Sequence, residues 1–160
     1  MDRLIVYGNG FSFGVKEPAG WVAETAEVAR QLQVNVVFFP ADVGPKPGAV
    51  NIRVRVNKKV DEHTEEDLKY DLAQYRKEFP NAQFVDLQTN HREYRTFSKL
   101  VYETDRFYEY VAYVNPGTMS PFVFSVGMSN RHNPASDSEL KAFETVLQSL
   151  VWLTTNVQTK

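Results

Sequence analysis

The sequence predicts an α+β domain with a mainly antiparallel sheet of about six or seven strands and two long helices. Three observations support this prediction. Strand-like segments follow one another between residues 82 and 129 with only short turns between them. Helical apolar stripes flank that run, at residues 64–79 and 136–152. Residues 34–39 are apolar on both faces of a strand, so helices are expected on both sides of the middle of the sheet.

The first predicted strand ends at a proline–glycine corner. Phe11 and Phe13 share one face of this strand because strand side chains alternate. Pro18 and Gly20 end the strand, and Trp21 follows at the corner. A buried tryptophan mostly serves as apolar bulk, which favours a structural plug over a binding-site aromatic. We therefore predict structural roles for Phe11, Phe13, Pro18, Gly20 and Trp21.

The next segments predict a short helix followed by two strands. Residues 22–32 carry apolar side chains at helical spacing. Residues 34–39 are expected to form a central strand covered on both sides. A Pro- and Gly-rich loop follows at 41–49. Residues 50–56 alternate between apolar and polar side chains, which predicts a strand with one exposed face.

Two longer helices bracket the remaining strands. Thr64 is the expected N-cap of helix 64–79. Ser136 and Glu139 can form a capping box at the start of the last helix, 136–152. The strands between them are predicted at 82–90, 93–104, 106–115 and 121–129. The short turns that separate these strands predict antiparallel neighbours.

The length fits one domain, residues 1–160. Its core is expected to span about residues 10–153, with 1–9 and 154–160 as terminal extensions. The net charge of −2 gives no general attraction to nucleic acid, and no segment approaches the length of a membrane span. We therefore expect neither a nucleic-acid partner nor a membrane-spanning segment.

No motif of an enzyme or a metal site is present in the sequence. There are no cysteines, which excludes disulfides, thiol catalysis and zinc–thiolate sites. His63, His91 and His132 lie in separate segments and are expected to be ordinary surface residues. Residues 125–129 place serines outside a glycine, the reverse of the nucleophile elbow of a serine hydrolase. We therefore expect no cofactor, no metal and no catalytic activity.

The opening motif resembles that of the PsbP-like superfamily. Phe11, Phe13, Pro18, Gly20 and Trp21 carry the match, and the order of elements is similar over about residues 10–153. The resemblance implies an α/β/α sandwich around an antiparallel sheet, without shared catalytic residues. It also implies a non-enzymatic binding or assembly role. Within the superfamily, the sequence most resembles exported bacterial members of unknown role. The protein is thus expected in the periplasm or cell exterior, with an export signal removed before Met1, or in the cytoplasm if Met1 is the native start.

Two hypotheses of function remain open. The first is a binding module that engages a protein partner. Segment 102–110 is dense in aromatic and charged side chains, which is typical of interface anchors and also of a solvated strand pair. Its expected contact residues are Tyr102, Arg106, Tyr108 and Tyr110.

The second hypothesis is a small-ligand-binding protein or an enzyme with a pocket between sheet and helix. A deep, polar cavity with a carboxylate or histidine of shifted pKa would favour it. Glu103 and Asp105, or Glu109 across the same hairpin, are the acids that could pair in such a site.

Overall fold

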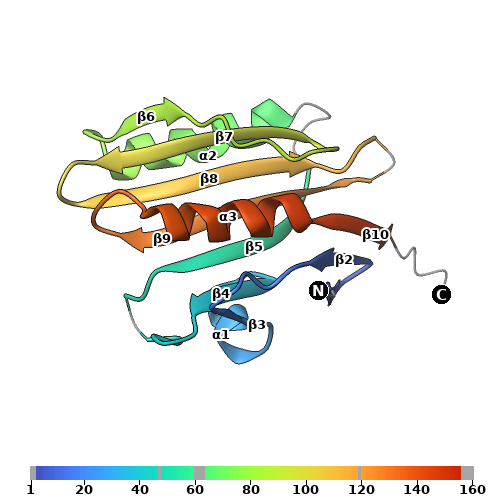
Figure 1. Ribbon diagram of the computed structural model, residues 1–160. Helices are drawn as coiled ribbons and strands as arrows, with labels where there is room; N and C mark the ends of the chain where they lie inside the picture. The colour runs from blue at the N-terminus through green and yellow to red at the C-terminus, as the bar shows by residue number, and fades with distance from the viewer. Residues whose placement is uncertain (1–2, 47, 60–63, 119, 156–160) are drawn as a thin grey trace.

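The computed structural model describes residues 3–46, 48–59, 64–118 and 120–155 (Figure 1). A seven-stranded sheet has the order β3-β4-β5-β9-β8-β7-β6, and every neighbouring pair is antiparallel. Its strands are β3 (Trp21–Glu24), β4 (Val36–Pro40), β5 (Asn51–Lys58), β6 (Gln83–Asp86), β7 (Arg95–Glu103), β8 (Phe107–Asn115) and β9 (Phe122–Arg131). A smaller antiparallel sheet contains β1 (Leu4–Gly8), β2 (Phe11–Val15) and β10 (Val151–Thr155), in the order β1-β2-β10.

Helices cover both faces of the large sheet. They are α1 (Glu27–Gln31), α2 (Thr64–Glu78) and α3 (Asp137–Ser149). Figure 1 shows α3 running across the front of the sheet and α2 behind it. The side chains of α3 and of the small sheet pack on one face, and those of α1 and α2 pack on the other. This arrangement confirms the predicted α+β class and the α/β/α sandwich that the resemblance implies.

The main core lies between α3, the small sheet and the front of the large sheet. Phe13 of β2 and Phe124 of β9 meet edge to face, with ring centroids 5.2 Å apart. Phe143 and Leu147 of α3 are fully buried above them. At the start of α3, the predicted capping box is present: Ser136 Oγ accepts from the Glu139 N–H, and Glu139 Oε1 accepts from the Ser136 N–H.

The proline–glycine corner places Trp21 in this core. The Trp21 N–H donates to Pro18 O at 3.0 Å, and Gly20 has a φ of +82°, which a residue without a Cβ adopts most easily. Trp21 is 9% exposed and belongs to the same apolar cluster as Phe11 and Phe13. The corner therefore turns the chain from the small sheet into the first edge strand of the large one.

The segments predicted as terminal extensions contain strands. β1 lies within residues 1–9 and pairs with β2, while β10 extends to Thr155 and pairs with the other side of β2. The predicted helix 136–152 ends at Ser149, and Trp152 instead belongs to β10. Its ring packs near Phe11, Phe122 and Phe124. The packing of this partly buried ring and the pairing of β10 with β2 stabilise a strand here in place of a further turn of helix.

Two predictions near the N-terminal half need correction. Residues 22–32 form both a strand and a helix, since β3 occupies the first part and α1 only the second. β4 is not central, because only β3 separates it from the sheet edge. Its apolar character on both faces nevertheless matches its burial: Val36 and Phe38 face the main core, while Val37 and Phe39 pack under α1.

The remaining elements follow the sequence pattern closely. Helix 64–79 corresponds to α2, although the residue before it and the side chain of Thr64 lie outside the described part. The four strands predicted between 82 and 129 correspond to β6, β7, β8 and β9. β5 has the predicted half-exposed character, with Ile52 and Val54 buried and Arg53 and Arg55 on the opposite face.

Candidate functional site

The β7–β8 hairpin presents part of the predicted partner surface. Tyr102 and Tyr108 are opposite each other in the sheet, and their rings stack with centroids 5.2 Å apart and an angle of 5°. The Tyr102 hydroxyl donates to Gln83 Oε1 at 2.9 Å. Arg106 is exposed in the turn, where its guanidinium pairs with Glu103 at 2.8 Å. These three residues, Tyr102, Arg106 and Tyr108, form an exposed or half-exposed group that we call the hairpin surface.

Tyr110 does not belong to the hairpin surface, which corrects the sequence prediction for this residue. It is only 5% exposed, and its ring packs near Phe143 of α3. Its hydroxyl accepts a hydrogen bond from the Ala135 N–H at 3.0 Å. Alternation places Tyr110 on the same face as Tyr108, but closer to the middle of the strand, where α3 covers it.

The prediction that all three histidines are ordinary surface residues is wrong for His91, which is only 9% exposed. Its Nδ1 accepts hydrogen bonds from the N–H groups of Glu93 and Tyr94, at 3.0 and 2.9 Å. Nε2 therefore carries the proton and donates to Leu150 O at 2.9 Å. His132 is exposed and contacts Arg106 O, and His63 lies outside the described residues.

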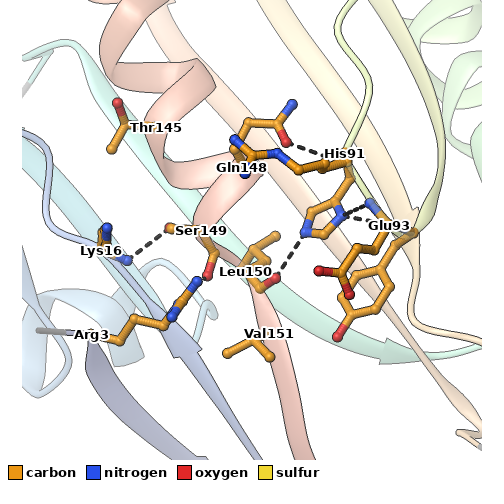
Figure 2. A pocket seen from close by; sticks show the side chains of 11 residues that line it. Arg3, Lys16, His91, Glu93, Thr145, Gln148, Ser149, Leu150 and Val151 are labelled. Atoms are coloured by element: carbon orange, nitrogen blue, oxygen red, sulfur yellow. Dashed lines mark hydrogen bonds between the residues drawn. The ribbon is translucent and has the colours of Figure 1, made fainter.

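His91 lines a polar cavity of about 270 Å³ at the end of α3 (Figure 2). Arg3 Nε donates to Ser149 O at 2.9 Å, and the Lys16 N–H donates to Ser149 Oγ at 2.8 Å. The Arg92 N–H donates to the Gln148 side chain. The last carbonyl groups of a helix have no partner within the helix. Arg3 and His91 donate to two such carbonyls, those of Ser149 and Leu150, while Lys16 and Arg92 hold side chains of the same turn. The cavity in Figure 2 therefore lies where residues 91–94, before β7, and Arg3 and Lys16, beside the small sheet, contact the end of α3.

A second cavity, of about 370 Å³, lies on the opposite face of the sheet. It is bounded by β5, β8 and β9 and by α2, and Val34, just before β4, also lines it. The apolar clusters under α1 and under α2 do not meet across this region. We call it the central cavity. It is the candidate functional site because its walls bring two arginines, two carboxyl groups and a tyrosine hydroxyl together around one opening.

One wall of the central cavity is positively charged. Arg53 and Arg55 lie two residues apart on β5, so they share the face that lines the cavity. Arg53 Nε donates to Asn51 Oδ1 at 2.7 Å, and the Asn51 amide in turn donates to Ala49 O. Among the described residues, neither terminal nitrogen of Arg53 has a hydrogen-bond acceptor. The guanidinium is thus oriented by one contact and retains donors for another.

The other wall contains two carboxylates and a tyrosine. Asp71 and Tyr75 lie four residues apart on α2, and Glu109 comes from β8. The Tyr75 hydroxyl donates to Glu109 Oε2 at 2.5 Å. Desolvation by burial raises the pKa of the Glu109 carboxyl, and the hydrogen bond from Tyr75 and the charge of Arg53 offset this only partly.

The pKa values of the neighbouring groups are shifted in the same direction. Desolvation raises the pKa of Asp71, although a hydrogen bond from Tyr113 and the charge of Arg55 oppose it. The pKa values of Tyr75 and Tyr113 are also raised, first by burial and then by the adjacent carboxylates. No described arginine is in direct ion-pair contact with Asp71 or Glu109. The cavity thus holds separated charges in a partly desolvated space.

Sequence reasoning missed this site. It placed Arg53 and Arg55 on a solvated strand face, and it assigned Tyr75 to an apolar helix stripe. It considered Glu109 only as a partner of Glu103 or Asp105, whereas Glu103 pairs with Arg106 in the turn. The signals that were present are the paired arginines in one strand and the (i, i+4) spacing of Asp71 and Tyr75. Their meeting requires the sheet order β5-β9-β8, which no local pattern reveals.

Two features are absent from the described residues. No group of three or more histidine or acidic side chains is arranged to hold a metal ion. No helix in this part of the chain is long and apolar enough to cross a membrane.

Comparison with known proteins identifies the fold. No protein-family model and no curated protein matches the sequence. Among solved structures, LpqN, which is involved in cell envelope biogenesis of Mycobacterium tuberculosis, is similar with a TM-score of 0.60 and 14% identity, over 94% of this chain and 90% of that chain. Cyanobacterial PsbP (CyanoP) from Synechocystis sp. PCC 6803 is similar with a TM-score of 0.53 and 16% identity, over 95% of this chain and 93% of that chain. With both matches running nearly end to end over the same sandwich, the chain has a PsbP-like fold.

Proposed function

We propose that this protein is an exported, non-catalytic accessory factor that engages a protein partner through the hairpin surface. Export and an accessory role are supported by the PsbP-like fold and by LpqN, which is described as involved in cell envelope biogenesis. A role without catalysis agrees with the lack of any catalytic motif in the sequence.

The hairpin surface carries the proposal of a protein partner. The stack of Tyr102 on Tyr108 presents a rigid aromatic area beside the exposed guanidinium of Arg106. Tyrosine and arginine dominate the binding energy of many interfaces, because they combine large contact area with hydrogen-bond donors. The turn itself is anchored from the neighbouring segment, since a ring nitrogen of His132 hydrogen bonds with Arg106 O at 3.0 Å. A partner would therefore meet a surface that needs little ordering.

The test is affinity capture from the native cells with the wild-type protein and with Tyr102→Ala and Arg106→Ala. Each variant should weaken capture of the same partner by about 1–2 kcal/mol, without loss of folding by circular dichroism. Tyr70→Ala is the matched control, because Tyr70 is 65% exposed but lies on α2, away from the hairpin. Equal capture by the wild type and both hairpin variants would remove the hairpin surface from the interaction.

The alternative hypothesis, a small-ligand-binding protein or an enzyme, is favoured by one observation. The central cavity is polar, lies between sheet and helix, and contains carboxylates with raised pKa values. The two hypotheses concern different faces of the molecule and are compatible with each other.

A further inference from the structure

The central cavity separates its charges by position in the sheet. Arg53 and Arg55 come from β5, and Glu109 comes from β8, with β9 between them. Two strand spacings correspond to roughly 10 Å. Asp71 reaches the same side as Glu109 from α2 above the sheet. A cationic wall and an anionic wall therefore face each other across the width of one strand.

The floor between the two walls has little bulk. β9 contributes Ser125, Gly127 and Ser129 to the cavity, while the alternate residues of the same strand are large and buried. A Cβ placed on Gly127 would meet only Tyr110 O, at 3.7 Å, which is an ordinary contact. The backbone there does not require glycine, so a side chain could occupy this floor. Because Gly127 has no side chain, this part of the cavity stays open, and the hydroxyl groups of Ser125 and Ser129 lie on either side of it.

This charge pattern discriminates between ligand classes. A simple anion would be attracted by the arginines but repelled by Asp71 and Glu109. A simple cation would be attracted by the two carboxylates but repelled by the arginines. A molecule with both charges would satisfy both walls at once. The desolvation of Asp71 and Glu109 raises the free energy of their charged forms, and an ammonium group beside them would lower it again.

We propose that the central cavity binds a small zwitterion, a free amino acid or very short peptide. Its carboxylate lies against Arg53 and Arg55, and its ammonium group against Glu109 and Asp71. The cavity of about 370 Å³ lies within the range of about 300–1,000 Å³ that small-molecule sites occupy. Serine hydroxyls on the floor add hydrogen bonds to either end. This zwitterion site is distinct from the proposed partner surface and contains no residue of the hairpin surface.

The test is a titration of the full chain with free amino acids and the dipeptide Gly-Gly, followed by amide NMR and calorimetry. Acetate and ethylamine serve as single-charge probes. At least one zwitterion should bind at concentrations up to roughly 10 mM, and both single-charge probes should bind about tenfold more weakly or not at all. Shifted amides should include those of Arg53 and Gly127. Absence of binding by every zwitterion, or binding of acetate as tight as that of the best zwitterion, would overturn the proposal.

Three sets of variants test separately how the cationic wall, the anionic wall and the floor contribute to zwitterion binding. Arg53→Gln and Glu109→Gln should each weaken zwitterion binding by about 10-fold or more, the range for a hydrogen bond to a charged group. Gly127→Val should abolish binding by filling the floor, and Gly127→Ala should weaken it less. Lys58 on β5 and Glu66 on α2 are exposed and do not line the cavity. The control variants Lys58→Gln and Glu66→Gln should therefore bind the zwitterion like the wild type.

Circular dichroism and thermal unfolding establish that each variant is folded. If Gly127→Val fails to fold, Arg53→Gln and Glu109→Gln still decide the outcome. Undiminished binding by both of these folded variants would place the zwitterion elsewhere and overturn the proposal. Loss of zwitterion binding in Arg53→Gln with unchanged partner capture would support this site independently of the hairpin surface.

Discussion

The two faces of the large sheet are built from the same strands but differ in composition. The face toward α3 carries a continuous apolar core, which reaches from Trp21 at one edge to the strands under α3. The opposite face carries two smaller clusters, one under α1 and one under α2. The central cavity lies between those clusters. One face is therefore filled with apolar side chains, and the other retains a polar opening in its middle.

Strand β9 shows the difference residue by residue. Phe124, Val126 and Met128 are fully buried in the main core. Ser125 and Gly127 alternate with them and line the central cavity. Because successive strand side chains point to opposite faces, one strand can supply stability on one side and a binding site on the other. Substitutions at neighbouring positions of β9 should thus affect different properties.

The largest expected effect tests that separation directly. Phe124→Ala removes a fully buried ring that packs against Phe13 and Trp152, and should lower the unfolding free energy by about 3–5 kcal/mol. Ser125→Ala, one residue along, should lower it by about 1 kcal/mol or less. Chemical denaturation of both variants measures the contrast. Equal losses of unfolding free energy in the two variants would contradict the conclusion that only the face toward α3 contributes strongly to stability at these positions.

A smaller effect is expected where a polar group supports the apolar face. His91→Ala leaves the Leu150 carbonyl and the N–H groups of Glu93 and Tyr94 without their partner. We expect a loss of about 1–3 kcal/mol in unfolding free energy, the usual effect of an unsatisfied buried group. The exposed His132 provides the matched control, and His132→Ala should change stability by less than about 0.5 kcal/mol. Equal stability of the two variants would show that the end of α3 does not depend on His91.

The smallest effect concerns the polar face and depends on pH. A raised folded-state pKa means that Glu109 contributes most to stability when it is protonated, below the ordinary carboxyl pKa of about 4.3. That contribution is lost as the pH rises through the folded-state pKa. Glu109→Gln should therefore flatten the decline of stability over this range. Unfolding free energies of wild type and variant at a series of pH values measure the difference, and parallel curves would contradict a desolvated Glu109.

Much of the fold was predictable because it rests on local patterns. A run of strand-like segments between short turns predicted the strands from β6 to β9, the apolar stripe of residues 64–79 predicted α2, and Ser136 with Glu139 predicted the start of α3. β1 and β10 were missed because short strands have weak patterns of their own. They are stabilised by pairing with β2, to which β10 returns from the far end of the chain.

The sequence by itself determined the α+β class, the order of most elements and the two faces of each strand, since these depend on residues close together in the chain. Only the tertiary structure decided what those faces meet. It buried Tyr110 and His91, and it brought Arg53 toward Glu109 across β9. The physical reason is that burial, desolvation and charge proximity depend on which segments pack together in space. Charged residues that read as a solvated strand face become a candidate binding site only when α2 and β8 close around them.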